Sequence, residues 1–135
     1  MKKTILFPLF SALLLVSVSS CQESKSERFE REAKEFTKTK CPSVSADGVI
    51  RTDSMVFHND GSNDMIYYYT ILDENSEAVL MRNMSSVEAE LRRGIINSVD
   101  MRHQKEAHLN FIYIYRSSTS GKEVMKFKFT PQDYY

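Results

Sequence analysis

The run Leu109–Tyr115 is the feature that most constrains the fold of this chain. Its sequence, LNFIYIY, is apolar on both faces when it is read as a strand, because successive side chains point to opposite sides. Strands with two apolar faces lie in the interior of a sheet. We therefore expect this run to be a central strand, and the rest of the chain must supply the elements around it.

Two runs upstream predict a β-hairpin. Residues 49–57 alternate in polarity, and residues 65–72 (MIYYYTIL) are rich in β-branched and aromatic residues. The segment HNDGSND between them is dense in turn residues, which is typical of a hairpin with a longer loop. Unbroken alternation would place these side chains together on one face: Ile50, Thr52, Ser54 and Val56.

A second hairpin follows the central strand. Residues 117–122 (SSTSGK) predict a turn, and Met125, Phe127 and Phe129 then alternate with Lys126 and Lys128. One face of this last strand is therefore expected to be buried and the other to be exposed to solvent. Exposed lysines favour an edge strand.

Two amphipathic helices are predicted. The first spans residues 24–39, because Ser24 and Glu27 fit a capping box and the Cys41–Pro42 pair ends the helix. The second spans residues 86–101, with apolar residues at helical spacing and a capping box within SSVE. The segment between Asp73 and Met84 reads as a turn and connection.

The order of elements is thus αββαββ, which predicts an α+β fold. Two hairpins can join into a four-stranded antiparallel sheet, with the two helices packed on one face. The length of 135 residues allows one core, so we expect a single domain over residues 26–135.

The start of the chain predicts a lipid anchor. Met1-Lys2-Lys3 is followed by an apolar run over residues 5–18, too short to span a bilayer as a stable helix, and then by Val18-Ser19-Ser20-Cys21. This pattern resembles the lipobox of bacterial lipoproteins. The resemblance implies a signal peptide over residues 1–20, acyl chains such as palmitate on Cys21, and a tether over residues 21–25.

Further residues resemble those of small uncharacterised lipoproteins of Bacteroidota-type genomes. They are Lys40-Cys41-Pro42, Asp53-Ser54-Met55, Tyr67-Tyr68-Tyr69 and Phe129-Thr130-Pro131-Gln132-Asp133-Tyr134. This resemblance implies an envelope location and no activity. Gln22 in place of the aspartate that retains enteric-type lipoproteins in the inner membrane favours the outer membrane, on either its periplasmic or its surface face.

Charge argues against nucleic acid as a partner. The 18 basic and 18 acidic side chains cancel, and loss of Lys2 and Lys3 with the signal would leave about −2. A near-neutral domain without a basic stripe lacks the footprint that phosphate backbones require.

No catalytic, metal or cofactor motif stands out. Cys41 would need a base such as His58, His103 or His108, and the spacing brings none of them close. His103 and His108 lack an accompanying HExxH or CxxC pattern, and the loop NDGSND lacks the closing glutamate of a calcium site. We expect a protein that is not an enzyme and has no cofactor.

Two weaker site hypotheses remain. The tyrosines at 67, 69, 113 and 115 fall on neighbouring predicted strands and could form a face that binds a glycan or an envelope protein, or they could pack in the core. Asp53-Ser54-Met55 resembles the acceptor of Bacteroidota-type O-glycosylation, so Ser54 is a candidate for modification.

These observations favour a membrane-anchored, non-enzymatic binding or accessory module. Two alternatives stay open: an inhibitor or immunity-type lipoprotein that caps a toxin or hydrolase, and an enzyme that uses Cys41. If one sheet face were bare, it would leave an apolar patch of the kind that usually marks a contact.

Overall fold

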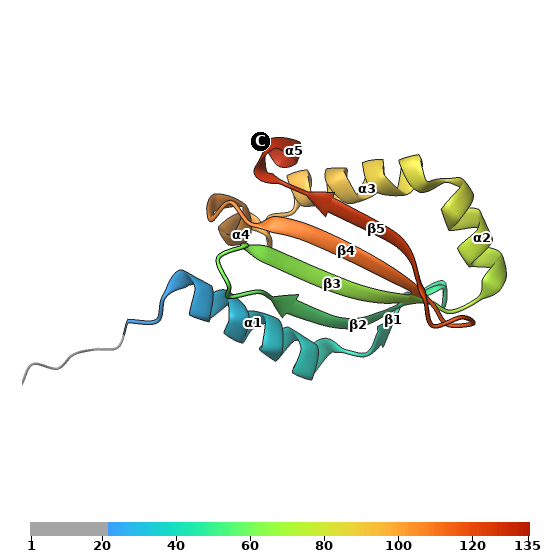
Figure 1. Ribbon diagram of the computed structural model, residues 1–135, viewed down its shortest axis with the longest axis horizontal. Helices are drawn as coiled ribbons and strands as arrows, with labels where there is room; N and C mark the ends of the chain where they lie inside the picture. Colours follow the sequence, from blue (N-terminus) through green and yellow to red (C-terminus); the bar gives the residue numbers. More distant parts are fainter. Residues whose placement is uncertain (1–21) are drawn as a thin grey trace, which may run out of the picture.

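The computed structural model describes residues 22–135, so the predicted signal peptide and Cys21 lie outside the described residues. The described chain folds as a five-stranded sheet with five helices (Figure 1). The elements are α1 (Lys25–Lys40), β1 (Ser43–Val44), β2 (Ile50–Phe57), β3 (Asp64–Ile71), α2 (Glu74–Arg82), α3 (Met84–Asn97), α4 (Arg102–Glu106), β4 (Asn110–Ser117), β5 (Glu123–Phe129) and α5 (Pro131–Tyr134).

The sheet is mixed, so the expected four-stranded antiparallel sheet with two helices is wrong. The strand order is β1-β2-β3-β4-β5, and β3 pairs with β4 in parallel while the other neighbours are antiparallel. The cause is the long connection between β3 and β4. Its helices carry the chain back to the end where β3 begins, as parallel pairing requires. The central position expected for β4 and the edge position expected for β5 are confirmed.

The helical connection is richer than the sequence analysis predicted. The segment left as a turn and connection contains α2, which begins at the N-cap Asp73. The helix expected over residues 86–101 instead spans Met84–Asn97, and its N-cap, Asn83, makes no side-chain capping bond. At its other end the ammonium of Lys105 donates to the carbonyls of Ile95 and Ile96, at 2.8 and 2.9 Å.

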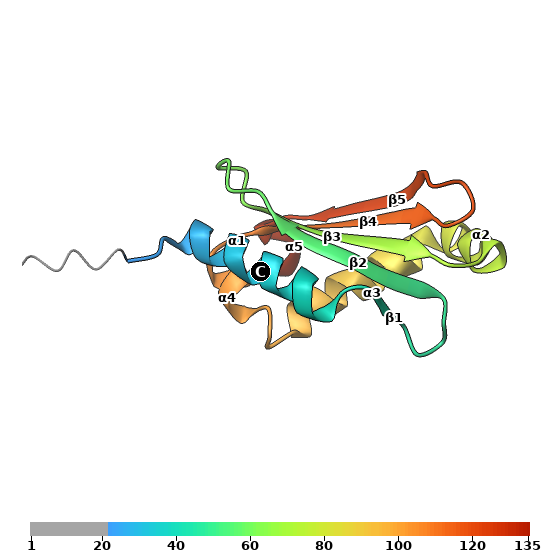
Figure 2. The ribbon, with the colours of Figure 1, turned by 90° about the horizontal axis from the view of Figure 1, so that it is seen from below.

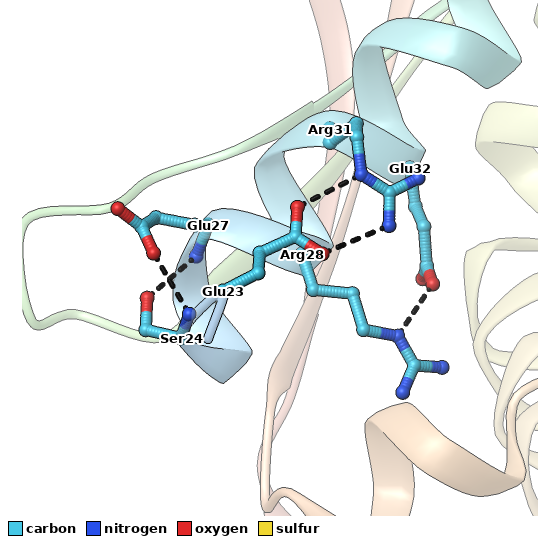
Figure 3. Close-up of polar contacts among 6 residues, drawn as sticks. All are labelled: Glu23, Ser24, Glu27, Arg28, Arg31 and Glu32. Carbon is cyan, nitrogen blue, oxygen red and sulfur yellow. Dashed lines mark hydrogen bonds and ion pairs between the residues drawn. The ribbon is translucent and has the colours of Figure 1, made fainter. Parts of the chain in front are cut away.

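The predicted start of α1 is confirmed. The hydroxyl of Ser24 accepts from the backbone N–H of Glu27, and the Glu27 carboxylate accepts from the backbone N–H of Ser24 (Figure 3). Phe29 and Ala33 are buried on the inner side of the helix. The apolar stripe therefore holds α1 against the sheet.

The helices lie on one side of the sheet, as Figure 2 shows with the strands seen nearly edge-on. On this helix face, α1 and α3 cover opposite margins of the sheet (Figure 1). The core fills the space beneath them, and its fully buried large side chains are Phe111, Phe129, Met65, Ile71, Ile95 and Leu109.

A β-bulge in β2 changes the expected assignment of side chains to faces. The register shifts between Thr52 and Ser54, so Asp53 is an extra residue in the strand. Thr52 is opposite Tyr69, whereas Ser54 is opposite Tyr68. Ile50 and Thr52 therefore share the helix face with Met55, and Ser54 and Val56 point to the other side.

Candidate functional site

The four tyrosines singled out in the sequence come together on the helix face. Tyr67 stacks on Tyr113 with ring centroids 5.0 Å apart, and Tyr69 stacks on Tyr115 at 4.9 Å. Tyr69 and Tyr113 are also near-parallel, at 6.2 Å. Because the faces of the rings are stacked against one another, they are not available to a ligand. We call these four residues the tyrosine array; a ligand could reach only their ring edges and hydroxyls.

The tyrosine array is largely buried, with Tyr113 and Tyr115 only 7% and 5% exposed. Within residues 22–135, none of the four hydroxyls has a recorded protein hydrogen-bond partner, and none is a completely buried unsatisfied atom. Burial nevertheless raises the pKa of Tyr67 and of Tyr115 to about 12, and burial raises the pKa of Tyr69 and of Tyr113 as well. The array is thus a row of protonated, neutral phenols at the margin of the core.

The opposite side of the sheet carries a second apolar cluster. Ile66, Ile112 and Ile114 are 5%, 5% and 7% exposed, and Tyr68 packs against them. In the part of the chain that the structure describes, no helix lies over them (Figure 2). We call this surface the open face, and its members are Ser54, Val56, Ile66, Tyr68, Ile112, Ile114, Arg116, Lys126 and Lys128.

Basic side chains border the open face. The register places Lys128 beside Ile112 and Lys126 beside Ile114, and both lysines are exposed. The guanidinium of Arg116 lies 5.5 Å from the centre of the Tyr68 ring, a cation–π contact. Long basic side chains can shield apolar atoms with their stems while their charged ends stay in water. That arrangement accounts for the low exposure of the isoleucines.

Carboxylates partly neutralise the basic side chains that border the open face. Asp64 lies 3.7 Å from the ammonium of Lys128. At the bulge, Asp53 accepts from Arg51 at 2.6 Å and from the hydroxyl of Thr70 at 2.6 Å. The register places Glu123 opposite Arg116, although within residues 22–135 neither Arg116 nor Lys126 forms an ion pair. The open face therefore combines an apolar centre with a modest excess of positive charge.

Ser54, the candidate glycosylation residue, lies on the open face within β2. Its side chain is half-buried, and it lines a shallow hollow of about 230 Å³ with Asp53, Tyr68 and Arg116. Modification of this hydroxyl stays a prediction.

Cys41 does not meet a histidine. It is the half-buried C-cap of α1, whereas His103 lines a hollow with Lys25 at the start of that helix. The 16 residues of α1 separate the two ends by about 24 Å. Burial and the nearby Asp53 raise the pKa of the Cys41 thiol, which disfavours the reactive thiolate.

A groove of about 380 Å³ runs between α1 and the unpaired edge of β2. Here the Thr37 hydroxyl donates to the carbonyl of Met55 and accepts from the Met55 N–H, both at 2.9 Å. The edge groups of Met55 are thereby satisfied within the molecule. A strand that entered this groove could not pair with the backbone of Met55, because Thr37 already bonds to it.

Residues 22–135 contain neither a cluster of metal-binding side chains nor a helix that could cross a membrane. Histidine, cysteine and carboxylate side chains form no group of three or more that could hold a metal ion there. None of the helices in this part of the chain combines the length and apolar character that crossing a bilayer requires.

The sequence analysis identified the tyrosine array but missed the open face as a set of residues. The signal was present in β4, whose Ile112 and Ile114 made its second face apolar. The sequence analysis predicted helices on one face of the sheet, but it did not predict which side chains would lie on the face left without a helix.

Comparisons with known proteins agree with this picture at the level of the fold. A crystal structure of a candidate secreted protein (PA3611) from Pseudomonas aeruginosa is similar over 82% of this chain and 92% of that chain, with a TM-score of 0.70 and 15% sequence identity. Curated proteins gave no match. A family described as "Domain of unknown function (DUF8479)" matches residues 24–125. Because this match spans well over half of the sequence, the chain belongs to the DUF8479 family.

Proposed function

We propose that this protein is a lipid-anchored, non-enzymatic binding module of the bacterial envelope, and that its open face contacts a partner protein. The observation that carries the proposal is the apolar centre formed by Ile66, Ile112 and Ile114 on strands without a covering helix. A solvent-facing sheet surface is ordinarily polar. An apolar centre within a polar border is typical of protein contact surfaces.

The chemistry of the border suggests the kind of partner. Arg116 and Lys126 would favour a surface that carries carboxylates around an apolar centre. A glycan is less suitable, because the rings of the tyrosine array stack on one another and Tyr68 is covered by Arg116. The balanced charge of the chain argues against nucleic acid.

The anchor rests on the residues that precede the described chain. The order of basic residues, apolar run, small residues and Cys21 supports lipidation, and Gln22 favours the outer membrane. The shared fold with a candidate secreted protein is consistent with export.

Site-specific photocrosslinking in intact cells tests the contact. A crosslinking amino acid at Val56, an exposed member of the open face, is expected to capture a discrete protein. The same amino acid at Ala89, on the exposed side of α3, serves as the control. Adducts that are equal at the two positions, or absent at Val56, would contradict the proposal.

Charge reversal sharpens the test. The double variant Lys126→Glu with Lys128→Glu should abolish the adduct from Val56, because it repels carboxylates on the partner. Lys40→Glu with Lys122→Glu makes the same change of charge at exposed positions outside the open face and away from the groove beside Val56. Loss of the adduct in both variants would show a general charge effect instead of a specific contact.

The anchor has its own test. Metabolic labelling with a fatty acid should mark the native chain and leave Cys21→Ser unlabelled. Absence of label on the native chain would remove the lipid anchor from the proposal.

A further inference from the structure

Glu23, which directly precedes the N-cap of α1, forms an ion pair with a residue of that helix. The Glu23 carboxylate accepts two hydrogen bonds from the Arg31 guanidinium, at 2.8 and 3.1 Å (Figure 3). Directly after it, the reciprocal bonds of Ser24 and Glu27 fix the start of the helix. We call the Glu23–Arg31 pair the clasp. It joins the tether to the domain at a defined place.

The clasp is ionised under physiological conditions. Its hydrogen bonds from Arg31 lower the pKa of Glu23 and raise the pKa of Arg31. Both groups therefore stay charged across the neutral range. Both side chains are largely exposed to water, so the clasp biases the position of the tether and does not fix it.

Very little chain separates the clasp from the predicted lipid. Two peptide units join Cys21 to Glu23, so their Cα atoms are at most about 8 Å apart. We propose, on the basis of the lipidation of Cys21 proposed above, that the clasp turns one end of the domain toward the lipid headgroups. This tether end consists of the start of α1, the loop of residues 58–63 and α4 (Figure 1).

The opposite end of the domain lies well away from the bilayer in this orientation. The turn of residues 118–122 follows β4 at the far end of the sheet (Figure 1). The eight residues of β4 span about 25 Å. The open face then stands upright beside the bilayer, where a partner protein can reach it.

The tether end suits contact with zwitterionic headgroups. Its arginines are matched by carboxylates: Arg28 pairs with Glu32 at 2.7 Å, and Arg102 pairs with Glu106 at 2.9 Å. The surface is hollowed beside Lys25, with cavities of about 110 and 290 Å³. Because the charges of the tether end are paired, anionic lipid should attract it only weakly. Its position at the bilayer is then set by the short tether.

A flat orientation is the competing arrangement. The cations of the open face would then lie on anionic lipids, and this adsorption would weaken as salt screens the charges. It would also cover the surface proposed for the partner protein. In the flat arrangement quenching is strongest on the open face and is lost at high salt, whereas in the proposed arrangement it is strongest at the tether end and largely survives high salt.

Fluorescence quenching in vesicles separates the two arrangements. Full-length lipidated protein, in a Cys41→Ser background, carries a fluorophore at Ser62→Cys, Thr119→Cys or Lys126→Cys. The vesicles contain phosphatidylethanolamine, phosphatidylglycerol and a lipid with a spin-labelled headgroup. We expect quenching at Ser62 to exceed quenching at Thr119 several-fold. High salt should reduce this ratio only in part, because salt screens the exposed clasp but leaves the short tether intact. Equal quenching, or strongest quenching at Lys126 that salt abolishes, would overturn the proposal.

Variants of the tether test its cause. Eight flexible residues inserted between Gln22 and Glu23 add about 15 Å of reach and should equalise quenching at Ser62 and Thr119. Glu23→Ala should lower the ratio of the two, whereas Glu35→Ala, at an exposed position on the same helix, should not. A ratio unchanged by both the insertion and Glu23→Ala would refute the role of the tether and clasp.

Mass measurement and vesicle flotation distinguish the two possible failures. A chain without acyl groups contradicts the lipid anchor itself. A lipidated chain that floats with vesicles but shows equal quenching contradicts only the orientation.

Discussion

The two faces of the sheet contain side chains of similar exposure in very different surroundings. Ile71, on the helix face, is 0% exposed within the core beneath the helices, and Ile66, on the same strand, is 5% exposed on the open face. Ile66 is shielded by neighbouring strand side chains instead of a packed layer. Low exposure therefore does not distinguish a core from a surface that a partner could cover.

The largest expected effect is at high pH and concerns the helix face. Burial raises the pKa of Tyr67 and Tyr115 to about 12, whereas an unfolded tyrosine titrates near 10. Between these values the unfolded chain loses protons first, so the free energy of unfolding falls as pH rises. For these two residues the loss by pH 12 amounts to up to roughly 5 kcal/mol.

Absorbance of tyrosinate and circular dichroism, followed together, check this prediction. Part of the tyrosine titration should be delayed and should coincide with unfolding. Complete titration near pH 10 with the fold intact would show that the tyrosine array is open to water.

A matched pair of substitutions compares the two faces directly. Ile71→Ala should lower the free energy of unfolding by about 4 kcal/mol, because it leaves a cavity in an enclosed core. Ile66→Ala should cost about 2 kcal/mol, since the neighbouring side chains of the open face can close over the gap. Chemical denaturation measures both. Equal losses would mean that the open face is packed as tightly as the core.

The contact between α1 and the edge of β2 should be a smaller contribution. Thr37→Val removes both hydrogen bonds to the Met55 backbone and should cost about 1–2 kcal/mol. Thr39→Val is the control, because that hydroxyl bonds only to Glu35 within its own exposed helix. A loss no greater than that of the control would show that water replaces Thr37 at the edge.

The smallest effect is expected from the lysines of the open face. Lys126→Ala and Lys128→Ala should each change the free energy of unfolding by no more than about 0.5 kcal/mol, as is usual for surface substitutions. Binding of an apolar fluorescent dye should increase at the same time, because the lysine stems no longer shield the isoleucines. Unchanged dye binding would mean that other side chains provide the shielding.

Local patterns in the sequence predicted part of the local structure, although the capping box expected within SSVE is absent and the segment expected as a connection contains α2. The capping box at Ser24, the strand periods and the lysines of the edge strand β5 depend on contacts between near neighbours, and each is present. The bulge at Asp53 breaks the alternation of side chains along β2. There the Asp53 carboxylate accepts hydrogen bonds from Arg51 and from Thr70 on the neighbouring strand. A residue-by-residue reading of one strand could not reveal that network.

The global arrangement was harder to predict because long-range geometry decides it. The connection from β3 to β4 could return the chain to either end of the sheet, and α3 runs back along the sheet to the end where β3 begins, which gives the parallel arrangement (Figure 1). The same uncertainty applied to the candidate site. The tyrosine array was visible as alternating residues, and helices on one face were expected, but the members of the open face depend on the parallel pairing of β3 with β4 and on the bulge in β2.

The two hydrogen bonds between Thr37 and Met55 have a consequence for the membrane-anchored state proposed above. Chains confined to a surface meet one another often, and exposed strand edges are the usual starting points of intermolecular sheets. Thr37 occupies the edge groups of Met55, and the bulge at Asp53 distorts the strand just before it. Helix α1 therefore blocks intermolecular strand pairing at this part of the β2 edge, in addition to covering the core.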